Sequence, residues 1–174
     1  MKTVDDIITG ALGDDQAGEK VRYAKGIGID HANAQDDQMD GVKLLTVEGA
    51  RKAMRKDFFD DPKISTLPEE LHTQVVDYAI ESGIGRAVIT LQEVLEKIRH
   101  VRPDVGYGHI DADGVIGAVT RRAAAAAVAL LGGDEVNNQI AAAREGYLRR
   151  AMAGRVKVSD DQIARCRSFR TDIG

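Results

Sequence analysis

Tryptophan is absent from this chain, cysteine occurs once, and aromatic residues make up only 4% of its 174 positions. One cysteine cannot form an internal disulfide, and Cys166 stands between two arginines, so we interpret it as a buried or incidental thiol rather than a nucleophile. The four histidines show no metal-ligand spacing and have no cysteine nearby: His31, His72, His100 and His109. The sequence therefore predicts neither a metal site nor a cofactor.

Long apolar runs are also missing, since none approaches the roughly 20 residues needed to cross a bilayer. The chain has no excess of positive charge, with 24 Lys and Arg against 28 Asp and Glu. The N-terminus MKTVDDIITG is acidic where a signal peptide would be apolar. We therefore expect cytoplasmic synthesis, no membrane insertion and no nucleic-acid partner. Action elsewhere would require lysis, a phage particle or a channel, with the protein virion-associated or released to the periplasm.

The hydrophobic content of 43% and the charged content of 30% are typical of a globular protein, and we predict one domain over residues 1–174. Apolar residues repeat at three- and four-residue spacing in most of the chain, which predicts a mostly α fold of about six to seven helices. Outside the central segment, the expected helices are 4–12, 46–60, 116–131, 134–148 and 160–169, with Thr46 and Ser159 as the N-cap residues of the second and the last. Residues 13–41 are polar and rich in glycine, so we expect an irregular or β-like segment there, with a short strand at 26–30.

The central segment LPEELHTQVVDYAIESGIGRAVITLQEVL, residues 67–95, has two apolar stripes separated by one break. Leu71, Val75 and Tyr78 mark the first stripe, and Val88 and Leu91 lie on the second. The sequence SGIG between them supplies residues that end one helix and begin the next. We predict a helical hairpin with a glycine at its elbow.

Two stretches, FFDDPKISTLPEELHTQVVDYAIESGIGRAVITLQEVL and DADGVIGAVTRRA, resemble glycoside hydrolase family 108. This family contains phage endolysins and secretion-activator muramidases with a C-terminal predicted peptidoglycan domain. The resemblance covers residues 46–123 and implies a lysozyme-like fold. It implies a degenerate muramidase-like part at 1–66 and a helical part at 67–174 resembling the predicted peptidoglycan-binding region. The implied partner is peptidoglycan, or a protein of a phage or secretion assembly.

The hairpin carries the pattern D-x-A-x-x-x-G-x-x-R-A, beginning at Asp77 and reaching Arg86. The resemblance implies that Asp77, Tyr78 and Arg86 face the cleft and bind substrate. A structural alternative is that Asp77 and Arg86 pair with each other or cap the two helix ends, because a carboxylate and a guanidinium across a tight turn readily form a bidentate contact. The sequence leaves both interpretations open.

The first helix departs from the family pattern I-x-x-x-E-G-G, whose Glu is the proposed catalytic acid. Here the stretch IITGALG places Ala11 at that position. General acid catalysis contributes about 10² to 10⁴ in rate, and alanine cannot donate a proton. We predict a catalytically impaired protein, retained as a structural or cell-wall-interacting component of a phage particle or secretion system.

An active endolysin is the alternative: an N-acetylmuramidase that cleaves the glycan strand with a displaced acid such as Asp14 or Asp15. These residues follow Ala11 by three and four positions, a poor placement for proton transfer. We favour the interpretation that they are a solvated acidic pair that ends the helix.

Two further motifs are given structural interpretations. Phe58 and Phe59 stand where the family tends to have Tyr-Trp, and we expect Phe58 in the core rather than under a sugar. The DADG sequence lacks the ligands of a calcium loop at His109 and Thr120. We therefore expect its aspartates, Asp111 and Asp113, to shape a turn and cap the next helix.

Overall fold

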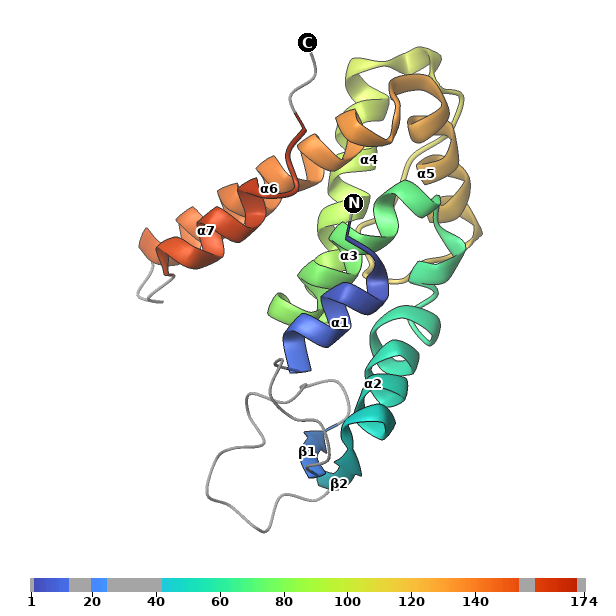
Figure 1. The fold of residues 1–174 in the computed structure, drawn as a ribbon. Coiled ribbons are helices and arrows are strands. Elements are labelled where there is room, and N and C mark those ends of the chain that lie inside the picture. The colour runs from blue at the N-terminus through green and yellow to red at the C-terminus, as the bar shows by residue number, and fades with distance from the viewer. Residues whose placement is uncertain (1, 13–19, 25–41, 154–158, 172–174) are drawn as a thin grey trace.

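The computed structural model describes residues 2–12, 20–24, 42–153 and 159–171. Within those residues it contains seven α-helices and one two-stranded sheet (Figure 1). The elements are α1 (Val4–Leu12), β1 (Lys20–Ala24), β2 (Val42–Thr46), α2 (Val47–Arg55), α3 (Glu69–Ser82), α4 (Ile84–Val101), α5 (Ala118–Leu131), α6 (Gly133–Ala153) and α7 (Asp160–Arg167). The prediction of a mostly α, lysozyme-like fold is confirmed. No helix in the described residues has the length and apolarity that a membrane span requires.

The predicted hairpin is formed by α3 and α4. Its elbow is Gly83, whose φ of +87° lies in a region that side-chain-bearing residues rarely adopt. The Gly83 N–H donates to the carbonyl of Ala79 at 3.0 Å, which ends α3, and its carbonyl accepts from Ala87 N at 3.1 Å, which starts α4. The buried stripes of both helices then face the protein interior.

This hairpin is the centre of the molecule. Helix α1 packs on α3 and α2, and α6 packs on both α3 and α4. Helix α5 lies against α6 and α4, while α7 runs beside α6 on the opposite side of the molecule from α5 (Figure 1). The main core extends from Ile7 in α1 to Ile140 in α6. A smaller cluster of Leu148, Ile163 and Cys166 joins α6 to α7, so the cysteine is buried.

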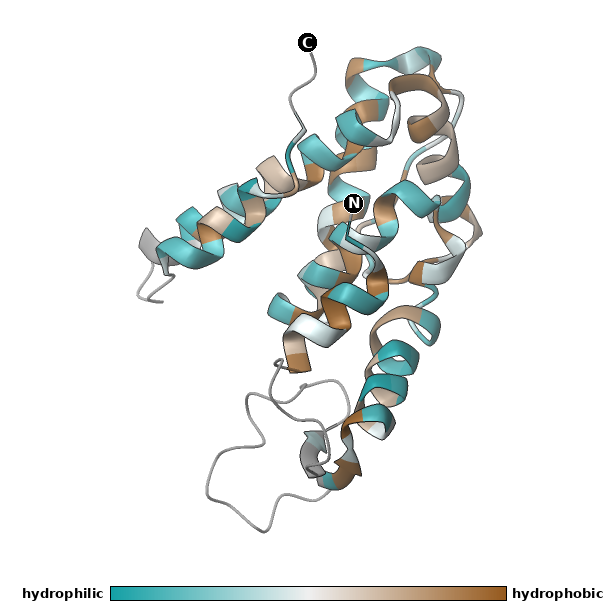
Figure 2. Ribbon diagram, in the orientation of Figure 1, coloured by the Kyte–Doolittle hydropathy of each residue, from teal (hydrophilic) through white to brown (hydrophobic). Residues whose placement is uncertain are grey.

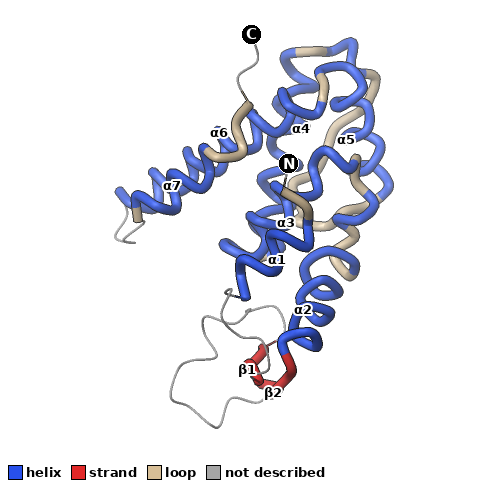
Figure 3. Tube along the Cα trace, in the orientation of Figure 1, coloured by secondary structure: helices blue, strands red, loops and turns tan. Residues whose placement is uncertain are grey.

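The two strands pair antiparallel, from Lys20 opposite Thr46 to Ala24 opposite Val42, close to the start of α2 (Figure 3). The strand predicted at 26–30 lies outside the described residues. Strand β2 was not predicted, because its five residues run directly into α2 and carry no alternating pattern of their own. Thr46 ends the strand and also caps the helix, as predicted: its hydroxyl accepts from Gly49 N at 3.1 Å.

Helix α2 continues into one π-helical turn, Lys56–Asp60, which contains both phenylalanines. Phe58 and Phe59 are buried, so the prediction that Phe58 belongs to the core is confirmed. The ring of Phe59 meets that of His72 edge-on at 5.0 Å. This turn therefore anchors the end of α2 to α3.

The DADG turn is shaped by Asp113, as predicted. Its Oδ1 accepts from Gln92 Nε2 at 2.7 Å and from Val115 N at 2.9 Å. The prediction that the aspartates cap the next helix is wrong. The N-cap residue of α5 is Gly117, four residues beyond Asp113, and it provides no side-chain cap.

Candidate functional site

Ala11 lies in the last turn of α1 and is partly buried against the main core. Ile7, Ile8 and Leu12 are the buried residues of this short helix and set its orientation. The position that the family resemblance assigns to the catalytic acid therefore presents a methyl group. The candidate acids Asp14 and Asp15 fall outside the described residues.

The two carboxyl groups on α1 itself are engaged in structural contacts. Asp5 Oδ1 lies 2.7 Å from Arg55 Nη1, which joins α1 to α2. Asp6 Oδ2 accepts from Thr3 N at 2.7 Å, and that backbone hydrogen bond lowers the pKa of Asp6. A general acid needs a raised pKa near neutral pH, so the lowered pKa of Asp6 does not suit that role.

Asp77 is almost completely buried in α3, with 1% of its surface exposed. Its Oδ1 accepts from Arg165 Nε at 2.8 Å, and its Oδ2 lies 2.7 Å from Arg144 Nη2. Both carboxylate oxygens thus contact guanidinium groups, one from α6 and one from α7. No hydrogen bond or ion pair joins Asp77 to Arg86, both of which the structure describes, so the predicted pairing across the elbow is wrong.

Arg144 completes an ionic cluster that we define as Asp77, Glu81, Arg144 and Arg165. The Arg144 side chain has no exposed surface, and its Nε donates to Glu81 Oε2 at 3.0 Å. Two cations and two anions balance in this cluster, which is the condition under which buried charge is tolerated. The cluster connects α3, α6 and α7. Asp77 therefore helps to hold these three helices together.

Tyr78 is also fully buried, and the Arg144 guanidinium lies 4.8 Å from its ring centre. Burial raises the pKa of Tyr78. Arg86 is partly exposed and lies over the ring of Tyr147, 4.5 Å from its centre. Substrate binding by Asp77, Tyr78 and Arg86 stays a prediction; of the three, Arg86 has the most accessible side chain.

A cavity of about 370 Å³ opens between α1, α3 and α7, next to this cluster. Lys2, Asp6 and Gly10 border it on one side, and Arg165 and Phe169 border it on the other. Asp77 contributes to its wall. The cavity is therefore a concave surface that includes Gly10, the residue before Ala11. The carboxyl groups in its lining, those of Asp6 and Asp77, already have the partners described above.

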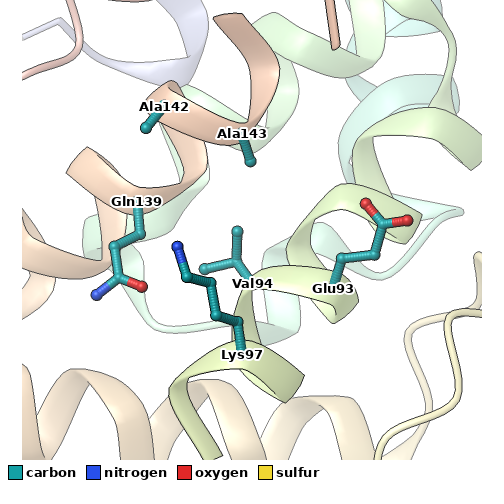
Figure 4. A pocket seen from close by; sticks show the side chains of 6 residues that line it. All are labelled: Glu93, Val94, Lys97, Gln139, Ala142 and Ala143. Carbon is teal, nitrogen blue, oxygen red and sulfur yellow. The ribbon is translucent and has the colours of Figure 1, made fainter. Parts of the chain in front are cut away.

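A second hollow of about 280 Å³ lies between α4 and α6 (Figure 4). Lys97 reaches from α4 toward Gln139, whereas Glu93 turns away from it (Figure 4). Val94 and two alanines of α6 make up the rest of the lining. This hollow holds no pair of acidic groups that could cleave a glycosidic bond. Across the described part of the chain, no group of three or more His, Cys, Asp or Glu is arranged to hold a metal ion.

Sequence reasoning missed one contact beside the first helix. Tyr23, buried in β1, donates its hydroxyl to Asp57 Oδ2 at 2.6 Å. Burial and this carboxylate raise the pKa of Tyr23. The contact ties the sheet to the π-helical turn, and no spacing rule could have found it because 34 residues separate the partners.

The buried Arg144 was missed as well, although the sequence carried a signal for it. Val136, Ile140 and Leu148 are buried on α6 at intervals of four, or twice four, residues, and Arg144 falls on the same stripe. An arginine on an apolar helix face requires an anionic partner elsewhere in the fold. That partner could not be chosen from the sequence among the many aspartates and glutamates.

One comparison with known proteins, that with family models, agrees with the resemblance seen in the sequence. Residues 11–83 match the family model described as Glycosyl hydrolase 108. The structure of SagA from Brucella abortus is similar over 74% of this chain and 67% of that chain, with 28% identity and a TM-score of 0.48. No curated protein matches the chain significantly.

Proposed function

Residues 11–83 match the Glycosyl hydrolase 108 family model, and from that match we propose that the chain is a cell-wall-associated relative in which glycan cleavage is lost or strongly impaired. Peptidoglycan is its binding target in this proposal. The protein keeps the lysozyme-like helical scaffold and serves as a structural or cell-wall-interacting component of a phage particle or secretion system.

Ala11 carries the proposal. Hydrolysis of a glycosidic bond requires a carboxylic acid that protonates the leaving oxygen, and its loss lowers the rate by about 10² to 10⁴. The Ala11 methyl group packs against the core and can neither donate nor accept a proton. Loss of a catalytic side chain leaves a scaffold intact, since the residues that perform chemistry are seldom those that form the core.

The remaining described carboxyl groups support the same conclusion. A general acid in a lysozyme-like site has a raised pKa, produced by apolar surroundings. Five described carboxyl groups have a pKa shifted downward instead: Asp6, Glu96, Asp104, Asp113 and Glu145. Asp77, beside the cavity, has each oxygen in contact with an arginine. None of these groups is arranged to deliver a proton to a sugar.

A lysis assay on purified cell walls tests the proposal. The unmodified chain should not clear a cell-wall suspension or a zymogram, whereas Ala11→Glu should recover activity by about 10² to 10⁴ over that background. Thr9→Glu is the matched control, because it adds the same side chain to α1 two residues away. Cosedimentation with insoluble peptidoglycan should show binding by both the unmodified chain and the variants.

Robust lysis by the unmodified chain would contradict the proposal. If Asp14→Asn or Asp15→Asn then abolished that lysis, the protein would be an active endolysin with a displaced acid. The assembly role has a separate test, which is mass spectrometry of intact virions and of secretion-system preparations for peptides of this chain. If the chain were absent from virions and from secretion-system preparations, the assembly role would be refuted. The cell-wall association would then be judged by cosedimentation.

A further inference from the structure

Positive charge is concentrated at the C-terminal end of this acidic protein. Residues 144–174 carry eight Lys and Arg against four Asp and Glu, whereas residues 1–143 carry 16 against 24. Six of these eight basic residues lie on the second half of α6, on α7 or just beyond it, where hydrophilic residues predominate along the ribbon (Figure 2). Such a separation of charge within one chain marks a surface suited to an anionic partner.

Three of these arginines form what we call the Glu145 cluster. Arg149 Nη2 on α6 lies 2.7 Å from Glu145 Oε1, and Arg167 Nη2 at the end of α7 lies 2.8 Å from the same oxygen. Arg170 Nη2, just beyond α7, lies 3.0 Å from Oε2. Glu145 is buried, while the side chains of Arg149 and Arg167 are each 54% exposed. A single buried carboxylate thus gathers exposed guanidinium groups from three segments.

The charges in this cluster do not balance. One carboxylate neutralises one of three arginines, so two positive charges remain at the surface, and Arg150 beside them is exposed as well. Each guanidinium has five N–H donors, and the two oxygens of Glu145 cannot accept from all of them. The hydrogen bond from Arg167 and that from Arg149 hold the pKa of Glu145 down at about 2, so the carboxylate stays charged and keeps the arginines in place.

The ionic cluster around Asp77 differs in this respect, because its two arginines meet two carboxylates. Its formal charges balance without a ligand. The Glu145 cluster is held in position but keeps free donors facing solvent, and preorganised donors of this kind bind anions with little loss of side-chain freedom.

We propose that the Glu145 cluster is a binding site for the carboxylate groups of peptidoglycan stem peptides. This inference rests on the proposed function, which makes peptidoglycan the target, and it names the part of that polymer that is bound. Arginine is suited to the role because its planar guanidinium forms paired hydrogen bonds with a carboxylate. A wall polymer also presents many such groups, so weak individual contacts add up.

Cosedimentation with sacculi freed of attached polymers tests the site. The key variant is Arg149→Gln with Arg170→Gln, which leaves Arg167 to pair with Glu145 and so preserves the fold. The control is Arg121→Gln with Arg122→Gln, which removes the same charge from α5, on the other side of the molecule from α7 (Figure 1). Thermal unfolding confirms that both variants are folded.

The cluster variant should bind sacculi about tenfold or more weakly than the unmodified chain, since each arginine near an anionic surface contributes about fivefold. The α5 variant should bind normally. Amidation of the sacculus carboxylates, or about 0.5 M salt, should weaken the unmodified chain in the same way.

Equal binding by the cluster variant would overturn the inference. Undiminished binding to amidated sacculi or to peptide-free glycan strands would also overturn the inference. The proposed cell-wall association would survive either of these results. Stronger binding to vesicles of anionic phospholipid than to sacculi would also refute the inference, because the cluster would then be a site for the phosphate groups of a membrane. Failure to bind any wall preparation would remove both the inference and the proposed function.

Discussion

Replacing Asp77 with asparagine would keep the shape of the side chain and remove its charge from the ionic cluster. Arg144, which has no exposed surface, would then keep only Glu81 as an anionic partner, and Arg165 would lose its contact with α3. Removing one partner of a buried ion pair typically destabilises a protein by about 3–5 kcal/mol. Glu81 and the half-exposed position of Arg165 reduce that figure, so we expect Asp77→Asn to lower the free energy of unfolding by about 2–4 kcal/mol.

The assay is chemical and thermal unfolding followed by circular dichroism. For a chain of this length, 1 kcal/mol corresponds to about 2–4 °C in Tm, so Asp77→Asn should lower Tm by roughly 4–16 °C. Asp104→Asn is the control, because its pair with Arg102 is on the surface, where such pairs contribute about 0–1 kcal/mol.

The sole cysteine adds a local readout, since Cys166 is buried in α7 next to Arg165. A thiol reagent should react faster with Asp77→Asn than with the unmodified chain under native conditions, because α7 has lost its contact with α3. A variant within 0.5 kcal/mol of the unmodified chain, with an unchanged thiol rate, would refute the assignment of Asp77 as the central anion of the fold.

Three further outcomes can be measured in the same way. Glu145 has a lowered pKa, so its stabilising effect should be complete above about pH 4.5 and should disappear as the pH falls through about 2. The unfolding free energies of Glu145→Gln and of the unmodified chain should therefore become equal as the pH falls over that range. Glu96 raises the pKa of His109 through a contact of 2.9 Å. That stabilisation should therefore be complete below about pH 6.5 and disappear as the pH rises through the raised value, and a pH titration of Tm with no difference between His109→Gln and the unmodified chain would contradict it. Phe58→Ala should lower the free energy of unfolding by about 3–5 kcal/mol in urea titrations, because the ring is buried in the core, and a loss below 1 kcal/mol would place it outside.

Local features of the fold were predictable from the sequence because their physical causes are local. The spacing of Leu71, Val75 and Val88 predicted two helices, and the glycine at position 83 predicted the elbow between them. The N-caps Thr46 and Ser159 were found in the same way, since a capping hydroxyl accepts from a backbone N–H only two or three residues ahead. Strand β2 could not be predicted in this way, because a strand forms by hydrogen bonding to a partner strand that is distant in sequence.

The candidate site was only partly accessible from the sequence. The alanine at position 11, where the family pattern has its proposed catalytic acid, could be recognised by comparison with that pattern, because residue identity is read directly from the sequence. The contacts of the hairpin residues could not be found in this way. One of the interpretations left open paired Asp77 with Arg86, nine residues away, but Asp77 meets Arg165, 88 residues away, and Arg86 lies over Tyr147.

The sequence by itself determined the helical class, the hairpin elbow and the alanine at position 11 of the first helix, since each depends on the identity and spacing of neighbouring residues. Only the tertiary structure decided how the charges are paired. Arg144 and Arg165 meet Asp77, and three other arginines meet Glu145, because helix packing brings distant segments within hydrogen-bond distance. Ion pairs form between whichever groups the packed core places together, and no local rule selects one carboxylate from the 28 Asp and Glu in the chain.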